Sequence, residues 1–129
     1  RLTPAVAAWV VLLAACGGPG VEAEGDPALS AHPRISPTPP MVGEALLTVE
    51  VTDRGVPAPE GTRVVVAPLG DGPERGPESV LRPGERGRWS GKVVFPEAGA
   101  VRLEIQVTLP GGRSAIFRYP VTVARRPGP

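Results

Sequence analysis

The sequence predicts an all-β protein, an immunoglobulin-like antiparallel β-sandwich of about seven strands. From Met41 onward, apolar residues recur at every second position, as expected of strands with one buried side. Glycine and proline stand between these segments as turn residues, and no helical pattern follows the first apolar run. Short strands separated by such turn signals are typical of a sandwich.

The alternation is clearest in residues 101–109, whose odd positions are all Val, Leu or Ile, while Glu104 and the other even positions are polar. The same period predicts further strands at 47–52, 62–67, 78–81, 89–95 and 117–123. Trp89 and Tyr119 fall on the inner sides of their strands. We therefore expect both rings in the core rather than on a ligand-binding face.

Composition limits the chain to one domain and to a narrow range of partners. It has 129 residues, of which 41% are hydrophobic, 17 are Gly and 18 are Pro. The net charge is only +1, and acids and bases are mixed along the chain without a basic stripe, so nucleic-acid binding is not expected. The basic pair Arg125-Arg126 lies in the last segment, 125–129, which is expected to be a disordered, solvated tail.

The N-terminal segment has the pattern of an export signal. Arg1 precedes an apolar run, Ala5 to Leu13, which is about half the length that spans a bilayer. The run ends in Leu13-Ala14-Ala15-Cys16, which resembles the lipobox of bacterial lipoproteins. The resemblance implies cleavage after residue 15 and acylation of Cys16. An ordinary secretory signal with an incidental cysteine is the alternative.

These features predict an order of segments along the chain. Residues 1–15 are a lipoprotein signal peptide, and 16–40 are the lipidated Cys and a Pro/Gly-rich tether that holds the domain off the lipid surface. Residues 41–124 are the β-sandwich. The protein is therefore expected in the cell envelope, lipid-anchored on the extracytoplasmic side of the membrane through acylated Cys16.

Several turns of the predicted domain resemble the YtkA-like domains, which are related to the FixH-like family. The matching features are Pro40 with Gly43, the segment Gly87-Arg88-Trp89-Ser90-Gly91, and Phe95 to Gly99 followed by an alternating strand. The resemblance spans roughly residues 40–123. It implies a secreted or membrane-tethered sandwich, and for some members a part in copper handling or respiratory-oxidase assembly.

The metal ligands of that family do not carry over to this chain. Many members have Met and His in the loop before the Gly-aromatic-Gly segment, and such soft ligands suit Cu(I). Here the corresponding loop, residues 69–86, has carboxylates and arginines but neither Met nor His. His32 and Met41 are the remaining candidates elsewhere, and because a lone His is usually solvent-facing, we expect no metal site and no cofactor.

No catalytic residues are predicted. Ser90 and Ser114 fall at outward strand positions, and the one His of the chain, His32, lies in the predicted tether away from them. We therefore expect a non-enzymatic lipoprotein that acts by binding a partner in the cell envelope. The alternatives are an accessory factor in copper handling or oxidase assembly, and a spacer domain without a ligand. Residues 54–61 and 70–86 are the longest loops and the natural contact surfaces.

Overall fold

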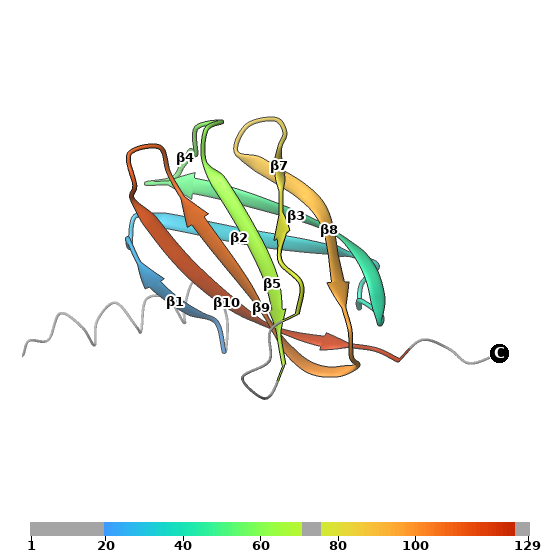
Figure 1. The fold of residues 1–129 in the computed structure, drawn as a ribbon. Coiled ribbons are helices and arrows are strands. Elements are labelled where there is room, and N and C mark those ends of the chain that lie inside the picture. The colour runs from blue at the N-terminus through green and yellow to red at the C-terminus, as the bar shows by residue number, and fades with distance from the viewer. Residues whose placement is uncertain (1–19, 71–75, 126–129) are drawn as a thin grey trace, which may run out of the picture.

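The computed structural model describes residues 20–70 and 76–125, and all regular elements in these ranges are strands. They form two antiparallel sheets that face each other (Figure 1). The strands are β1 (Glu22–Gly25), β2 (Leu29–Ser36), β3 (Gly43–Asp53), β4 (Val56–Pro57), β5 (Arg63–Leu69), β6 (Ser79–Val80), β7 (Arg82–Pro83), β8 (Arg88–Phe95), β9 (Gly99–Thr108) and β10 (Ser114–Val123). The predicted all-β class and sandwich architecture are confirmed.

The chain alternates between the two sheets. Sheet A has the order β1-β10-β9-β5-β6, and sheet B has the order β2-β3-β8-β7 with β4 added beside β3. The β9–β10 hairpin pairs along ten residues of each strand, from Ser114 opposite Thr108 to Val123 opposite Gly99. Met41 and Ala124 form an isolated parallel bridge between the sheets near one end.

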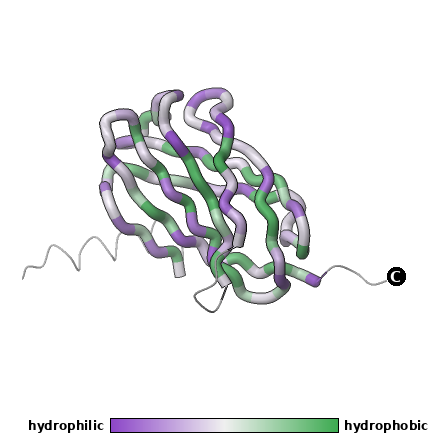
Figure 2. The backbone as a smooth tube through the Cα atoms, in the orientation of Figure 1, coloured by the Kyte–Doolittle hydropathy of each residue, from purple (hydrophilic) through white to green (hydrophobic). Residues whose placement is uncertain are grey.

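The core lies between the sheets and follows the predicted alternation. The odd positions of β9 from Val101 to Val107 are at most 8% exposed, and Trp89 in β8 is 1% exposed. In Figure 2 hydrophobic and hydrophilic residues alternate along the strands, as expected when only one side of each sheet is buried. The predicted inward position of Trp89 is therefore confirmed.

The prediction of a tether over residues 16–40 is wrong for the residues that the structure describes. Residues 22–25 form β1 at the edge of sheet A, and residues 29–36 form β2 at the edge of sheet B. Leu29 and Ala31 are buried in the core. Because an edge strand pairs on one side only, it tolerates a proline such as Pro33, which cannot donate to a ladder. The sandwich therefore begins with β1, well before Met41.

Side-chain contacts of Tyr119 and Arg113 hold β2 and the turn between β1 and β2 to the rest of the domain. The Tyr119 hydroxyl in sheet A donates a hydrogen bond to the Ala31 carbonyl in sheet B, and partial burial raises the pKa of this phenol. Arg113, in the β9–β10 turn, is bonded to Asp53 at 2.9 Å and to Asp26 at 2.6 Å. The hydrogen bonds from Arg113 lower the pKa of both carboxyls. Tyr119 is thus an inward, partly buried residue, as predicted.

Candidate functional site

The structure separates the two candidate metal ligands. His32 is exposed in the middle of β2, opposite Glu50 of β3. Met41 lies before the start of β3 at Gly43. The strand between Gly43 and Glu50 advances roughly 23 Å, so His32 and Met41 cannot bind one ion together. Across residues 20–70 and 76–125, no three His, Cys, Asp or Glu side chains are grouped as a metal site would require.

The remaining predicted positions are distributed as follows. Cys16, the signal peptide and residues 126–129 lie outside the described residues, as does part of the loop 70–86. Ser90 and Ser114 are exposed on strands, as expected, and His32 is not beside either in the sheet pairing. Residues 54–61 include β4, and residues 70–86 include β6 and β7. In the described part of the chain, no helix has the length and apolar character needed to cross a membrane.

The outer face of sheet B exposes two apolar side chains beside each other. Leu46 in β3 is 54% exposed and Val94 in β8 is 36% exposed. Leu46 pairs with Lys92, and Val94 pairs with Glu44, so the two apolar residues are diagonal neighbours across the β3–β8 ladder. Diagonal neighbours lie about 7–8 Å apart, so Leu46 and Val94 are neighbouring exposed apolar residues on this face.

Cationic side chains lie along the face on one side of this apolar pair, while the carboxylate Glu44 is directly opposite Val94. One cross-strand row runs from Arg34 in β2 through Thr48 and Ser90 to Arg82 in β7. Lys92 and Arg88 lie in the neighbouring rows of β8. We call the surface formed by these residues the sheet B face: Arg34, Leu46, Arg82, Arg88, Ser90, Lys92 and Val94. Among the described residues, two ion pairs join these cations to carboxylates on the same face: Lys92 with Glu44 at 3.7 Å and Arg88 with Glu50 at 3.6 Å. Both pairs are long and exposed.

The outer face of sheet A is different, because its charges bind one another. Arg118 in β10 bonds to Glu104 of β9 at 3.2 Å and to Glu24 of β1 at 3.0 Å. The Gln106 amide donates to the same Glu104 carboxylate at 3.0 Å. Glu104 points outward as predicted, but it is only 4% exposed because these neighbours cover it. The pKa of Arg118 is raised, first by its hydrogen bond with Glu24.

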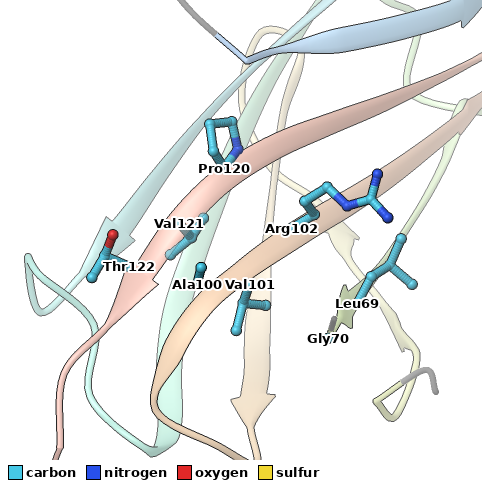
Figure 3. A pocket seen from close by; sticks show the side chains of 8 residues that line it. All are labelled: Leu69, Gly70, Ala100, Val101, Arg102, Pro120, Val121 and Thr122. Carbon is cyan, nitrogen blue, oxygen red and sulfur yellow. The ribbon is translucent and has the colours of Figure 1, made fainter. Parts of the chain in front are cut away.

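A shallow depression lies at one end of sheet A, where β5, β9 and β10 come together (Figure 3). It has a volume of about 560 Å³ and is lined by Leu69, Gly70, Ala100, Val101, Arg102, Pro120, Val121 and Thr122. Arg102 is opposite both Leu69 and Pro120 in the sheet. Arg102 is half-exposed and lies 3.5 Å from Glu22 of β1. The lining therefore combines apolar side chains with the Arg102 guanidinium and the Thr122 hydroxyl.

Comparisons with known proteins support the fold and do not extend to a function. No protein-family model and no curated protein matches this sequence. Among solved structures, the crystal structure of the PmoD soluble domain from Methylocystis sp. ATCC 49242 (Rockwell) is similar, with a TM-score of 0.51 and 10% sequence identity. The match covers 73% of this chain and 90% of that chain. The likeness is one of fold, and the resemblance to YtkA-like domains stays a prediction.

Sequence reasoning did not find the sheet B face. Leu46 and Val94 are far apart in the chain, and each looks like a single exposed apolar residue in its own strand. Only the β3–β8 register brings them together. The local signal was the parity of each residue, since Leu46 is even-numbered in a strand whose buried positions are Leu47, Val49 and Val51.

Proposed function

We propose that this chain is a lipid-anchored, extracytoplasmic β-sandwich that acts without catalysis by binding a protein of the cell envelope through its sheet B face. The observation that supports this most directly is the exposed pair Leu46 and Val94 with cationic side chains beside it on the same face. Scattered apolar residues are normal on a surface, but contiguous ones with a polar rim are typical of contact sites.

The anchoring part of the proposal rests on the sequence. Leu13-Ala14-Ala15-Cys16 stands at the end of an apolar run that is too short to span a bilayer. Acyl chains on Cys16 would give additive membrane affinity for each buried methylene group. The sandwich that follows would then work at the membrane surface, on the extracytoplasmic side.

The chemistry of the sheet B face defines the partner. The outer side of sheet B carries more cations than carboxylates here. The cations are Arg34, Arg82, Arg88 and Lys92, and the carboxylates are Glu44 and Glu50. A partner with acidic groups next to an apolar contact would complement this arrangement. Arginine in particular suits such contacts, because its planar guanidinium binds carboxylates in a bidentate manner.

The copper-handling alternative depends on the resemblance to YtkA-like domains. It predicts tight one-to-one binding of Cu(I) by the domain, which a titration against a competing chelator measures. His32 and Met41 lie on separate parts of the fold, so a stoichiometric Cu(I) site would have to use other ligands. No binding would remove this alternative and leave the partner-binding proposal.

Site-specific photocrosslinking in intact cells tests the proposal. A photoreactive residue at Ser90 sits at the centre of the sheet B face, and one at Thr108 is a matched control, since both are exposed hydroxyl residues on strands of opposite sheets. The proposal predicts a discrete crosslinked envelope protein from position 90 and none from position 108. Equal products from both positions, or none from 90, would contradict it.

The lipid part is tested separately by the mass of the mature N-terminal peptide. Acylated Cys16 adds the mass of its acyl groups, and Cys16→Ser should release the protein from the membrane fraction. An unmodified Cys16 thiol in the mature protein would overturn the anchoring proposal without affecting the crosslinking result.

A further inference from the structure

The start of the described chain lies against the depression of sheet A. Gly20 is packed beside Pro120, because a Cβ at this glycine would meet Pro120 Cγ at 3.3 Å. From there β1 runs along β10, with Glu22 opposite Arg118. The chain therefore enters the sandwich at the end where Arg102, Pro120 and Thr122 line the depression. We call these residues and Gly20 the anchor end.

The distance between the anchor end and an acylated Cys16 is limited by covalent geometry. Gly20 is four positions after Cys16, and four extended residue steps span at most about 14 Å. This limit holds for any conformation of the segment. A spacer that holds the domain far from the bilayer is therefore not possible, since the strands begin too soon after the lipidation site.

From this limit we propose that the anchor end rests on the lipid surface, with Arg102 facing the phosphate groups of phospholipids. The inference rests on the proposed lipidation of Cys16. Within about 14 Å of the anchor, this end lies in or beside the headgroup layer.

The chemistry of the anchor end fits a headgroup layer. Pro120 and the neighbouring Leu69 supply apolar lining, and the Arg102 guanidinium supplies one cation that is half-exposed beside Glu22. A long cationic side chain over apolar surface can place its stem against the apolar groups and its charge against phosphate. Basic residues near an anionic leaflet are attracted to it.

The opposite end of the sandwich is less suited to the same contact. It has the carboxylates Asp26 and Asp53, held ionised by Arg113, together with the exposed turn at Arg54 and Gly55. The pKa of both carboxyls is lowered, so both remain charged at neutral pH. Arg113 is therefore already bound by two carboxylates, at 2.6 and 2.9 Å, whereas Arg102 at the anchor end meets one carboxylate at 3.5 Å.

Fluorescence quenching in vesicles tests the proposed orientation. The full mature lipoprotein is placed in vesicles of phosphatidylethanolamine and phosphatidylglycerol that contain spin-labelled lipid. Cys16 is the only cysteine of the chain, so once it is acylated a single introduced thiol can be labelled alone. Thr122→Cys marks the anchor end, and Thr108→Cys is the matched control on the same outer face, roughly 27 Å further along the sheet.

The proposal predicts quenching at position 122 roughly threefold stronger than at position 108, because only the first lies within the reach of the headgroup layer. Arg102→Glu should reduce quenching at 122 by about half in anionic vesicles, whereas Arg63→Glu, at the far end of the same face, should not. Equal quenching at the two positions in a lipidated protein would overturn the orientation alone. If mass measurement finds no lipid on Cys16, both the orientation and the anchoring are overturned.

Discussion

The outer faces of the two sheets differ in how their polar groups are satisfied. On sheet A, Arg118 joins Glu24 and the buried Glu104 into a network that also includes Gln106. On sheet B, the ion pairs of Lys92 and Arg88 are long and exposed, and Leu46 is open to solvent between them. A face whose charges bind one another stabilises the fold, whereas a face with exposed apolar groups and loosely paired cations is available to a partner.

The comparison assumes that β1 and β2 belong to the sandwich, and their removal should have the largest effect. A chain that starts at Met41 loses the edge strand of each sheet, together with buried Leu29 and Ala31. We expect it to show no cooperative urea unfolding, while a chain that starts at Gly20 unfolds in one transition. A stable, cooperatively unfolding domain from Met41 onward would instead favour a tether over residues 20–40.

Paired substitutions of one carboxylate on each face sharpen the comparison. Glu104→Ala should lower the free energy of unfolding by about 2 kcal/mol, because it leaves Arg118 without its buried partner. Glu50→Ala, on the outer side of sheet B, removes a half-exposed carboxylate 3.6 Å from Arg88. It should lower the free energy of unfolding by less than about 0.5 kcal/mol. Urea midpoints of the two variants measure the difference, and equal losses would mean that the two faces do not differ as described.

Arg113 should make stability depend on pH at acid values. Because it lowers the folded-state pKa of Asp26 and Asp53, its contribution is present above their ordinary pKa of about 4 and is lost as pH falls through the lowered folded-state values. Arg113→Gln should flatten the decline of stability below about pH 4. Unfolding curves of the variant and the wild type at several pH values measure the contribution of Arg113 to stability. If the stability of the variant declines as steeply as that of the wild type, the bonds from Arg113 to Asp26 and Asp53 do not contribute to the pH dependence.

The smallest effect on stability is expected on the sheet B face. Arg88→Glu combined with Lys92→Glu should change the free energy of unfolding by less than about 1 kcal/mol, because both side chains are exposed and weakly paired. The same variant should lose most of the crosslinked product from position 90. Loss of the product together with loss of folding would point to a structural role instead.

The sequence predicted those parts of the fold whose signal is local. Strand β9 alternates without interruption, and its inward residues are buried as expected. Strand β2 was missed because Pro33 and short side chains such as Ala31 resemble a linker, and only pairing with β3 makes a strand of it. The burial of Glu104 comes from Arg118, fourteen residues away, and so could not be deduced from the period of its own strand.

The candidate site also has one part with a local sequence signal and one part that depends on strand pairing. The lipidation of Cys16 stays a prediction, and it rests on a local signal, because the proposed export signal and cleavage motif are contiguous in sequence. The proximity of Leu46 and Val94 could not be predicted, since it depends on the register between two strands that are separated by two loops and several shorter strands. Surfaces made by register become visible only when the fold is known.

The most direct test of the account uses Lys92, which is the only lysine in the sequence and lies on the sheet B face with a 70% exposed side chain. The measurement is the rate at which an amine-reactive reagent labels Lys92 in native membranes, compared with the rate for purified lipoprotein in lipid vesicles. The account predicts labelling several-fold slower in native membranes, because a bound envelope protein covers Lys92 there and the vesicles control for the lipid surface. Equal labelling rates in the two preparations would contradict the claim that this face binds a partner.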